Sequence, residues 1–494
     1  MRIFLTKLSL VIGTAVVLSG LGIPQLPSYA QSHQFNTSEA RAHYDKAIEL
    51  GGKSDWNGAV LELNRALQQE PANPEILIEL GIVFGELKQW DQAKKNLQKA
   101  VELSPNSVRA HYNLGVTLDR AIPGKKLGTP EYRKALKLNP ADVSSLVNLA
   151  ANLGDENGEE ARKLLEKASQ IDPKNARAHF NLGLLLKNMG DQQGAMKALH
   201  KAIALDPEPL EPRRPLVALL VSEGKWDETI IQCQEILKRS ATDWNTRYTL
   251  GQTLIRNGKV EAGRRELQKS QELRQSQQKQ EAAEKMISRG VSALTRGEVE
   301  DGIKEFTTAL EIDNGSSPAY MYLGVALATA GSADQGIEKL NKAIELDPSS
   351  PRAHHNLGTV LMQSGRVDLA QREFEKALEL DPYFPETHNN LGLIFSKNNQ
   401  AEKAMEHFRL ASELNPQYVE ALFNLGLALR SANRVEEAAG AFRRAAELAP
   451  HNPQVHYALG MTLRDKGDVQ GAKEALDRAE ALQQQGRPKS KSQP

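Results

Sequence analysis

Six asparagines recur at one position of a sequence period, and their amide side chains suit the binding of peptide groups. They are Asn113, Asn148, Asn181, Asn356, Asn390 and Asn424. An amide both donates and accepts hydrogen bonds, as a peptide group does. Each asparagine precedes by two residues a small residue of an apolar stripe, so it is predicted to point away from the core of a helix pair. Two interpretations stay open: contacts to the backbone of a bound peptide, or surface residues with a structural hydrogen bond.

Histidines recur at a second position of the same period, four residues before the small residue. Six of the eleven histidines share it: His43, His111, His179, His354, His388 and His456. Histidine is a common metal ligand, but these side chains lie one period or more apart and nothing brings them together. We therefore expect packing side chains with one polar edge, and no metal site.

Other motifs resemble functional sites, but their sequence surroundings do not support a catalytic or ligand-binding role. Gly52-Lys53-Ser54 resembles the end of a phosphate loop, but the earlier glycine is missing, because residue 47 is alanine. Cys233 is the single cysteine, and it lies in an apolar stripe where burial is expected. No nucleophile elbow or zinc-binding helix motif occurs. The sequence thus predicts a protein without catalytic residues, cofactor, metal or small-molecule substrate; an enzyme with an unrecognised site is the minor alternative.

A period of 34 residues organises the elements that must position these side chains. Repeat glycines fall at 81, 115, 183, 251, 324, 358, 392, 426 and 460, at spacings of one or two periods except for one interval that is five residues longer. Each period contains two amphipathic helical stripes, as in 350–381, where Leu357 and Leu361 belong to the first and Phe374 and Ala377 to the second. Pro382 then ends the second helix.

The residues of the period match a known repeat pattern: Leu425, Gly426, Ala438, Phe442, Ala445 and Pro450. On these residues the chain resembles the tetratricopeptide repeat family, with about thirteen helix-turn-helix units between residues 40 and 485. The resemblance implies an all-α solenoid, a right-handed superhelix whose first helices line the concave face. The asparagine series is similar to the ladder in the superhelical repeat domain of O-linked N-acetylglucosamine transferases, which holds the backbone of an extended peptide. The catalytic domain of those transferases has no counterpart here.

The irregular places of the period divide the chain. A first array, 40–277, has about seven units, of which the third and sixth are degenerate because prolines interrupt them. Five extra residues, 278–282, form an insertion in a polar bridging helix. A second array, 283–486, has about six units, and the polar, basic tail 487–494 is expected to be disordered.

Residues 1–30 have the pattern of a secretory signal peptide. Arg2 and Lys7 precede an apolar run over 8–23, and the small residues Ser28 and Ala30 precede a cleavage site before Gln31. We therefore predict an exported protein, periplasmic or secreted. Association with a membrane is expected only if this segment remains uncleaved as an anchor.

Charge restricts the class of partner. The chain has 62 Lys and Arg against 62 Asp and Glu, so no cationic excess is available to neutralise nucleic-acid phosphates. We expect protein or peptide partners and no nucleic acid. The predicted function is a non-enzymatic scaffold that captures extended peptide segments in a concave groove outside the cytoplasm. The alternative is an assembly or secretion factor that docks folded partners, or itself, through the repeat faces.

Overall fold

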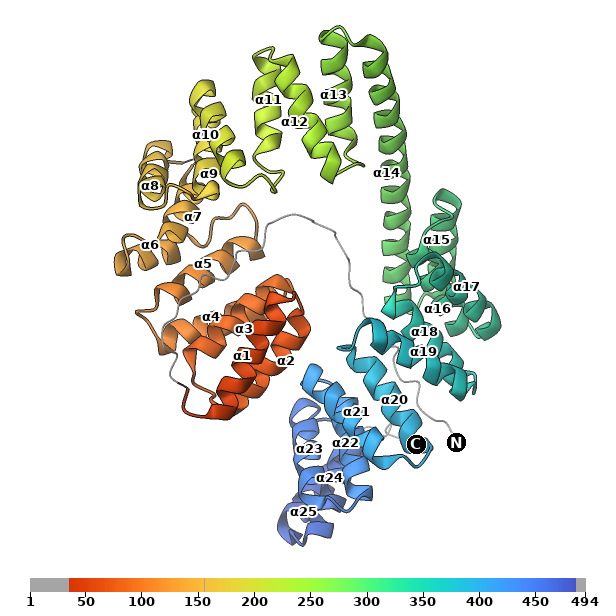
Figure 1. Cartoon of the computed structure of the whole chain (residues 1–494). Helices are drawn as coiled ribbons and strands as arrows, with labels where there is room; N and C mark the ends of the chain where they lie inside the picture. The colour runs from red at the N-terminus through yellow and green to blue at the C-terminus, as the bar shows by residue number, and fades with distance from the viewer. Residues whose placement is uncertain (1–34, 155, 486–494) are drawn as a thin grey trace, which may run out of the picture. The chain divides into compact units, whose positions relative to one another are not determined.

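The computed structural model describes residues 35–154 and 156–485. These residues form 25 α-helices and no β-strand, which confirms the predicted all-α class (Figure 1). Successive helices pair across short turns. The long helix α14 (Val260–Thr295) belongs to two pairs, as the second helix of one and the first helix of the next. The described residues therefore contain the thirteen helix-turn-helix units that the period predicts.

The chain divides into two compact units between Gln277 and Gln278, next to the predicted insertion 278–282. The described part of the first unit holds the first part of α14 and these helices: α1 (Ser38–Gly52), α2 (Trp56–Gln69), α3 (Pro74–Glu86), α4 (Trp90–Leu103), α5 (Val108–Ala121), α6 (Thr129–Leu138), α7 (Val143–Leu153), α8 (Gly158–Ile171), α9 (Ala176–Asn188), α10 (Gln192–Leu205), α11 (Arg213–Ser222), α12 (Trp226–Arg239) and α13 (Trp244–Arg256).

The described part of the second unit begins within α14. It continues through these helices: α15 (Val299–Ile312), α16 (Ser317–Thr329), α17 (Ala333–Leu346), α18 (Pro351–Gln363), α19 (Val367–Leu380), α20 (Pro385–Lys397), α21 (Ala401–Leu414), α22 (Val419–Ser431), α23 (Val435–Leu448), α24 (Pro453–Lys466) and α25 (Val469–Gln485).

The repeat glycine sets how closely the two helices of a unit approach. A Cβ atom on Gly392 would lie 2.6 Å from Cε1 of Phe408, whose ring is buried in the facing helix α21. Gly358 faces Phe374 and Gly426 faces Phe442 in the same way. The aromatic ring fills the space that the missing side chain leaves, so the period of glycines is a period of helix contacts.

The recurrent histidines link the elements within and between units. Nε2 of His111 lies 3.0 Å from the carbonyl oxygen of Pro105, and that of His388 lies 2.9 Å from the carbonyl oxygen of Pro382. Nδ1 of His111 also lies 2.6 Å from a carboxylate oxygen of Glu131 in the second helix. These contacts are those of packing side chains with a polar edge. Among residues 35–154 and 156–485, no group of three or more His, Cys, Asp or Glu could hold a metal ion.

Two units have shortened helices where the sequence contains additional prolines and glycines. The loop 122–128 separates α5 from α6, and α6 is ten residues long. The sixth unit begins with the ten-residue α11, after a proline-rich approach. The five extra residues cause no break, because α14 runs through them as one helix of 36 residues.

The predicted signal peptide, 1–30, and the predicted tail, 487–494, lie outside the described residues. A search of the described helices finds none with the length and apolar character needed to cross a membrane.

Candidate functional site

A groove of about 650 Å³ lies in the second compact unit, along the first helices of five successive repeats. Its walls come from α16, α18, α20, α22 and α24 and from the residues just before three of them. In α18 the lining residues include Arg352, His355, Asn356, Thr359 and Gln363. These positions share one side of a helix, so the groove follows the inner face that the repeat period predicts.

The groove crosses the five helices obliquely. It takes in α16 from Met321 to the last residue, Thr329, but only Gln454 and Val455 in the first turn of α24. In α20 the lining runs from Glu386 to the middle of the helix. A groove lined by five successive repeats suits an extended chain better than a compact small molecule, which usually contacts fewer elements.

Three of the six predicted asparagines line this groove together: Asn356, Asn390 and Asn424. All three are half-buried. The side-chain amides of Asn356 and Asn390 have no hydrogen-bond partner among the residues that the structure describes. Asn424 donates to Oδ1 of Asn389 at 3.0 Å. Two amides with open donors and acceptors therefore face the groove from successive repeats.

Sequence reasoning missed several lining residues. Asn389 is 5% exposed, and with Phe423 it occupies the position just before the asparagine series. His355 holds the same position in α18, where its ring stacks on Phe384 at 4.6 Å and its Nδ1 lies 2.8 Å from Oγ1 of Thr387. Adjacent positions of a helix differ by only about 100°, so the asparagine series and the residues just before it both face the groove. This relation could have been used to predict the second set from the sequence.

The groove is largely neutral, with its carboxylates on α20 and α22. Burial lowers the pKa of His355 to about 4, so its imidazole is neutral at pH 7. Burial raises the pKa of Glu386, and nearby Arg352 partly offsets that rise. Glu420 lies on the next helix and is exposed. Burial also raises the pKa of Tyr418, so its phenol stays protonated.

The other three asparagines lie in the first compact unit, and two of them already have partners. Nδ2 of Asn113 donates to the carbonyl oxygen of Arg109 in its own helix at 2.8 Å. Asn148 is 6% exposed; its Oδ1 accepts from Nη2 of Arg177 at 2.7 Å. Asn181 is half-buried, and its side-chain amide has no hydrogen-bond partner in the described residues. Asn148 is therefore buried against a neighbouring repeat, whose Arg177 covers its amide.

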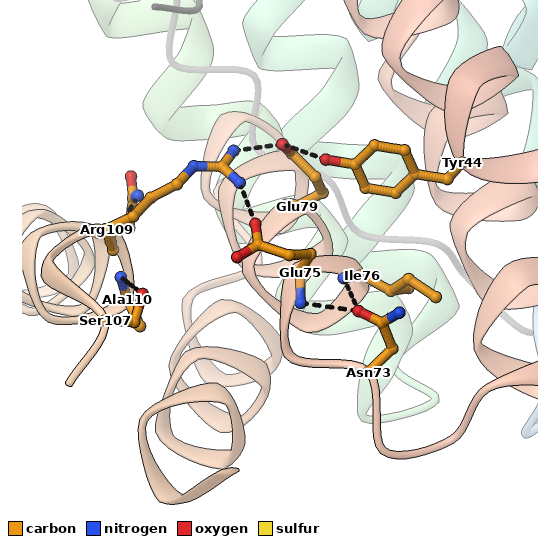
Figure 2. Close-up of polar contacts among 9 residues, drawn as sticks. Tyr44, Asn73, Glu75, Ile76, Glu79, Ser107, Arg109 and Ala110 are labelled. Carbon is orange, nitrogen blue, oxygen red and sulfur yellow. Dashed lines mark hydrogen bonds and ion pairs between the residues drawn. The ribbon is translucent and has the colours of Figure 1, made fainter. Parts of the chain in front are cut away.

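A partly buried ion-pair network occupies the corresponding face at the start of the first unit (Figure 2). Arg109 of α5 contacts Glu75 at 2.8 Å and also contacts Glu79, both in α3. The hydroxyl of Tyr44 in α1 donates to Glu79 at 3.1 Å. Glu79 is 4% exposed and stands in the position of the asparagine series. In these repeats, the side chain at the position of the asparagine series bonds to other first helices and does not face an open groove.

Cys233 lies in the core of the first unit. It is fully buried, and burial, together with nearby Asp243, raises the pKa of its thiol to about 12. A protonated, inaccessible thiol is a poor nucleophile, so the residue is a packing side chain.

Comparison with known protein families identifies repeats in several parts of the chain. Family models described as "Tetratricopeptide repeat" match residues 176–209, 351–384, 373–406, 395–453 and 429–490, and one described as "TPR repeat" matches 85–120, 157–190 and 326–365.

Among curated relatives, a type IV pilus assembly protein, PilF, of Pseudomonas aeruginosa is 32% identical over 154 residues, which are 31% of this chain and 59% of PilF. A protein O-mannosyl-transferase, Tmtc2, of Drosophila melanogaster is 40% identical over 75 residues, which are 15% of this chain and 8% of Tmtc2. The chain thus spans less than two thirds of either relative.

A solved structure of YrrB, described as a TPR protein with an unusual peptide-binding site, is 28% identical, with a TM-score of 0.33 and coverage of 37% of this chain and 93% of YrrB. The repeat period, the glycine-aromatic helix contacts and the family models agree. The chain belongs to the tetratricopeptide repeat family, whose members are protein-interaction scaffolds.

Proposed function

We propose that this protein is a non-enzymatic scaffold that captures an extended peptide segment in the groove along α16, α18, α20, α22 and α24. One observation carries the proposal: asparagines of successive repeats line a single groove, and two of them have open amides. A peptide group offers one donor and one acceptor, which match those of an amide side chain. Apolar lining residues such as Tyr322, Val325 and Leu393 supply surface for side chains of the segment.

The spacing of the repeats fits an extended chain. Neighbouring packed helices lie about 10 Å apart, and an extended chain rises about 3.3 Å per residue. Asn356 and Asn390 would therefore meet the bound backbone about three residues apart. Hydrogen bonds to the backbone do not depend on the side chains of the bound segment. Selectivity for a peptide sequence therefore comes from the other residues of the groove.

The names of the two relatives differ, because one is an assembly protein and the other a transferase. The match to the O-mannosyl-transferase Tmtc2 covers 8% of that protein, which is too little to assign a transferase activity to this chain. The name of PilF, an assembly protein, favours the second candidate function, in which the repeats dock a folded partner. The two functions differ in whether a linear segment is enough for binding.

A crosslinking experiment separates the two functions. A photoreactive amino acid at Gln363, which is exposed at the groove, captures partners in the native compartment, and the same group at exposed Glu447 on α23 is the control. Capture of one contiguous segment, whose synthetic peptide binds within about tenfold of the intact partner, supports the proposal. Binding that needs the folded partner supports docking instead.

The proposed place of action is outside the cytoplasm, after removal of residues 1–30. It rests on the basic start, the apolar run and the small residues before Gln31. The intact mass of the protein from its native compartment tests it. A chain that begins near Gln31 is expected, whereas a mass that retains residues 1–30 indicates an anchored protein.

A further inference from the structure

We propose that the segment held in the groove adopts the polyproline II conformation and places a large apolar side chain at every third residue. The proposal rests on the proposed function, because it concerns the segment that the groove captures. It names the class of partner, an uncharged and proline-rich chain that does not bind as a β-strand. The groove has three features that favour such a segment: its pitch, its fixed aromatic surfaces and an uncharged central part.

The repetition of the asparagines restricts the form of the bound backbone. Asn356 and Asn390 hold the same position of successive units, so they offer the same hydrogen bonds once per helix spacing of about 10 Å. Three residues of a β-strand cover this distance, but strand positions three apart face opposite sides, because a strand repeats every two residues. A polyproline II helix repeats every three residues and rises about 9 Å in that turn. Its peptide groups therefore meet both asparagines from the same side.

Aromatic rings form fixed surfaces along the groove. Tyr322 of α16 stacks on the buried ring of Phe306, with 5.6 Å between the ring centroids. Phe423 of α22 packs edge-on against buried Phe442, also at 5.6 Å. The stacked imidazole and phenyl rings of α18 and the start of α20 belong to the units between these two. Because a second ring sets the orientation of each, the groove has the aromatic lining on which polyproline II segments dock.

The groove is uncharged beyond the first turns of its helices. Leu393 follows Asn390 by three residues, so the two share one side of α20, and its side chain is 39% exposed. Val325 and Thr359 hold the corresponding position in α16 and α18. An uncharged segment with an apolar side chain at each helix spacing therefore matches this part of the groove. The charged residues of the lining all lie in the first turn of a helix: Arg352, Glu386 and Glu420.

Proline supplies the backbone that this arrangement requires. Its ring fixes φ at about −65°, close to the polyproline II value, so the segment is ordered before it binds. Less conformational entropy is then lost on binding. A polyproline II helix has no internal hydrogen bonds, so one N–H and one carbonyl group per turn are free to pair with one asparagine amide. A repeat of one apolar residue and two prolines meets all these conditions.

The test uses three fluorescent peptides of twelve residues, titrated against the full-length protein. The first contains four copies of Leu-Pro-Pro. The second arranges the same residues as two copies of Leu-Leu-Pro-Pro-Pro-Pro, which keeps the polyproline II form but moves two leucines out of the spacing of three. The third contains four copies of Leu-Thr-Thr, which keeps the spacing but favours a β-strand. The first should bind about tenfold more tightly than either of the others, the equivalent of one buried apolar side chain.

Protein variants locate the binding of the Leu-Pro-Pro peptide. Leu393→Ala should weaken it about three- to tenfold, because it removes an apolar contact in the groove. Leu369→Ala is the matched control, because Leu369 is 47% exposed on α19 and does not line the groove. The control should leave the affinity unchanged.

Three results would overturn the proposal: equal or tighter binding of the Leu-Thr-Thr peptide, equal or tighter binding of the rearranged peptide, or no binding of any of the three. If the Leu-Thr-Thr peptide binds and Asn356→Ala/Asn390→Ala weakens it, only the backbone form is wrong and the proposed function stands. If the Leu-Pro-Pro peptide binds Asn356→Ala/Asn390→Ala with full affinity, the role of the asparagines in the proposed function fails instead.

Discussion

Replacing Gly392 with alanine should destabilise the second compact unit, although alanine is the better helix former. The added Cβ would lie 2.6 Å from Cε1 and 2.7 Å from Cδ1 of Phe408, a fully packed ring. Overpacking of this kind costs about 1–3 kcal/mol. The gain from replacing glycine inside a helix is about 0.5–1 kcal/mol. The expected net loss is therefore about 1 kcal/mol, from the midpoints of the two ranges.

Gly440 provides the matched control. It lies in the middle of α23, and a Cβ atom there would meet nothing within 4 Å. Gly440→Ala should therefore stabilise the protein by about 0.5–1 kcal/mol. Urea denaturation measures both changes, and hydrogen exchange locates them. Because repeats contact mainly their neighbours, loosening in Gly392→Ala should centre on residues 351–448 and spare 40–138. An unchanged or raised stability, or loosening spread evenly along the chain, would refute the reasoning.

The remaining predictions concern charge and burial. Arg109→Met should cost about 2–4 kcal/mol in urea denaturation, because it leaves the buried carboxylate of Glu79 without its guanidinium; adding Glu79→Gln should recover part of this loss. Burial lowers the pKa of His355 and His407 to about 4, so the unfolded chain, with histidines near their ordinary 6.5, binds protons more readily. Stability should thus be full above about pH 6.5 and fall as the pH drops towards 4, and His407→Gln should flatten the profile of denaturation midpoint against pH. Cys233 should resist a thiol reagent at pH 8 in the folded protein and react fully in denaturant, since burial raises its pKa to about 12; rapid labelling of the native protein would contradict its assigned place in the core.

The period made the fold predictable. A glycine every 34 residues, an aromatic or leucine in the facing helix and a proline after it specify contacts that recur locally, so each unit could be read on its own. The prolines before α6 and α11 likewise marked the two shortened helices. The five extra residues 278–282 were expected in a polar bridging helix, and α14 runs through them as one continuous helix.

The site was predictable only in part. The asparagine series is visible in the sequence, but the sequence does not show which of its side-chain amides remain free to bind a ligand. That depends on side chains from other repeats, such as Arg177, which reaches Asn148 across 29 residues. The amides of Asn356 and Asn390 have no such partner among the described residues. Contacts of this kind follow from the stacking of units and not from the period.

The central claim is that open amides of the second unit hold the backbone of a bound segment. The direct measurement is titration of the captured segment against Asn356→Ala/Asn390→Ala and against the control pair Asn113→Ala/Asn148→Ala, with melting curves of each. Two lost hydrogen bonds of about 0.5–1.5 kcal/mol each should weaken binding by about 5- to 150-fold. The melting temperature should stay unchanged for the first pair. The control pair should melt earlier, because Arg177 loses its partner, and bind as the wild type does. Unchanged affinity in Asn356→Ala/Asn390→Ala would contradict the account.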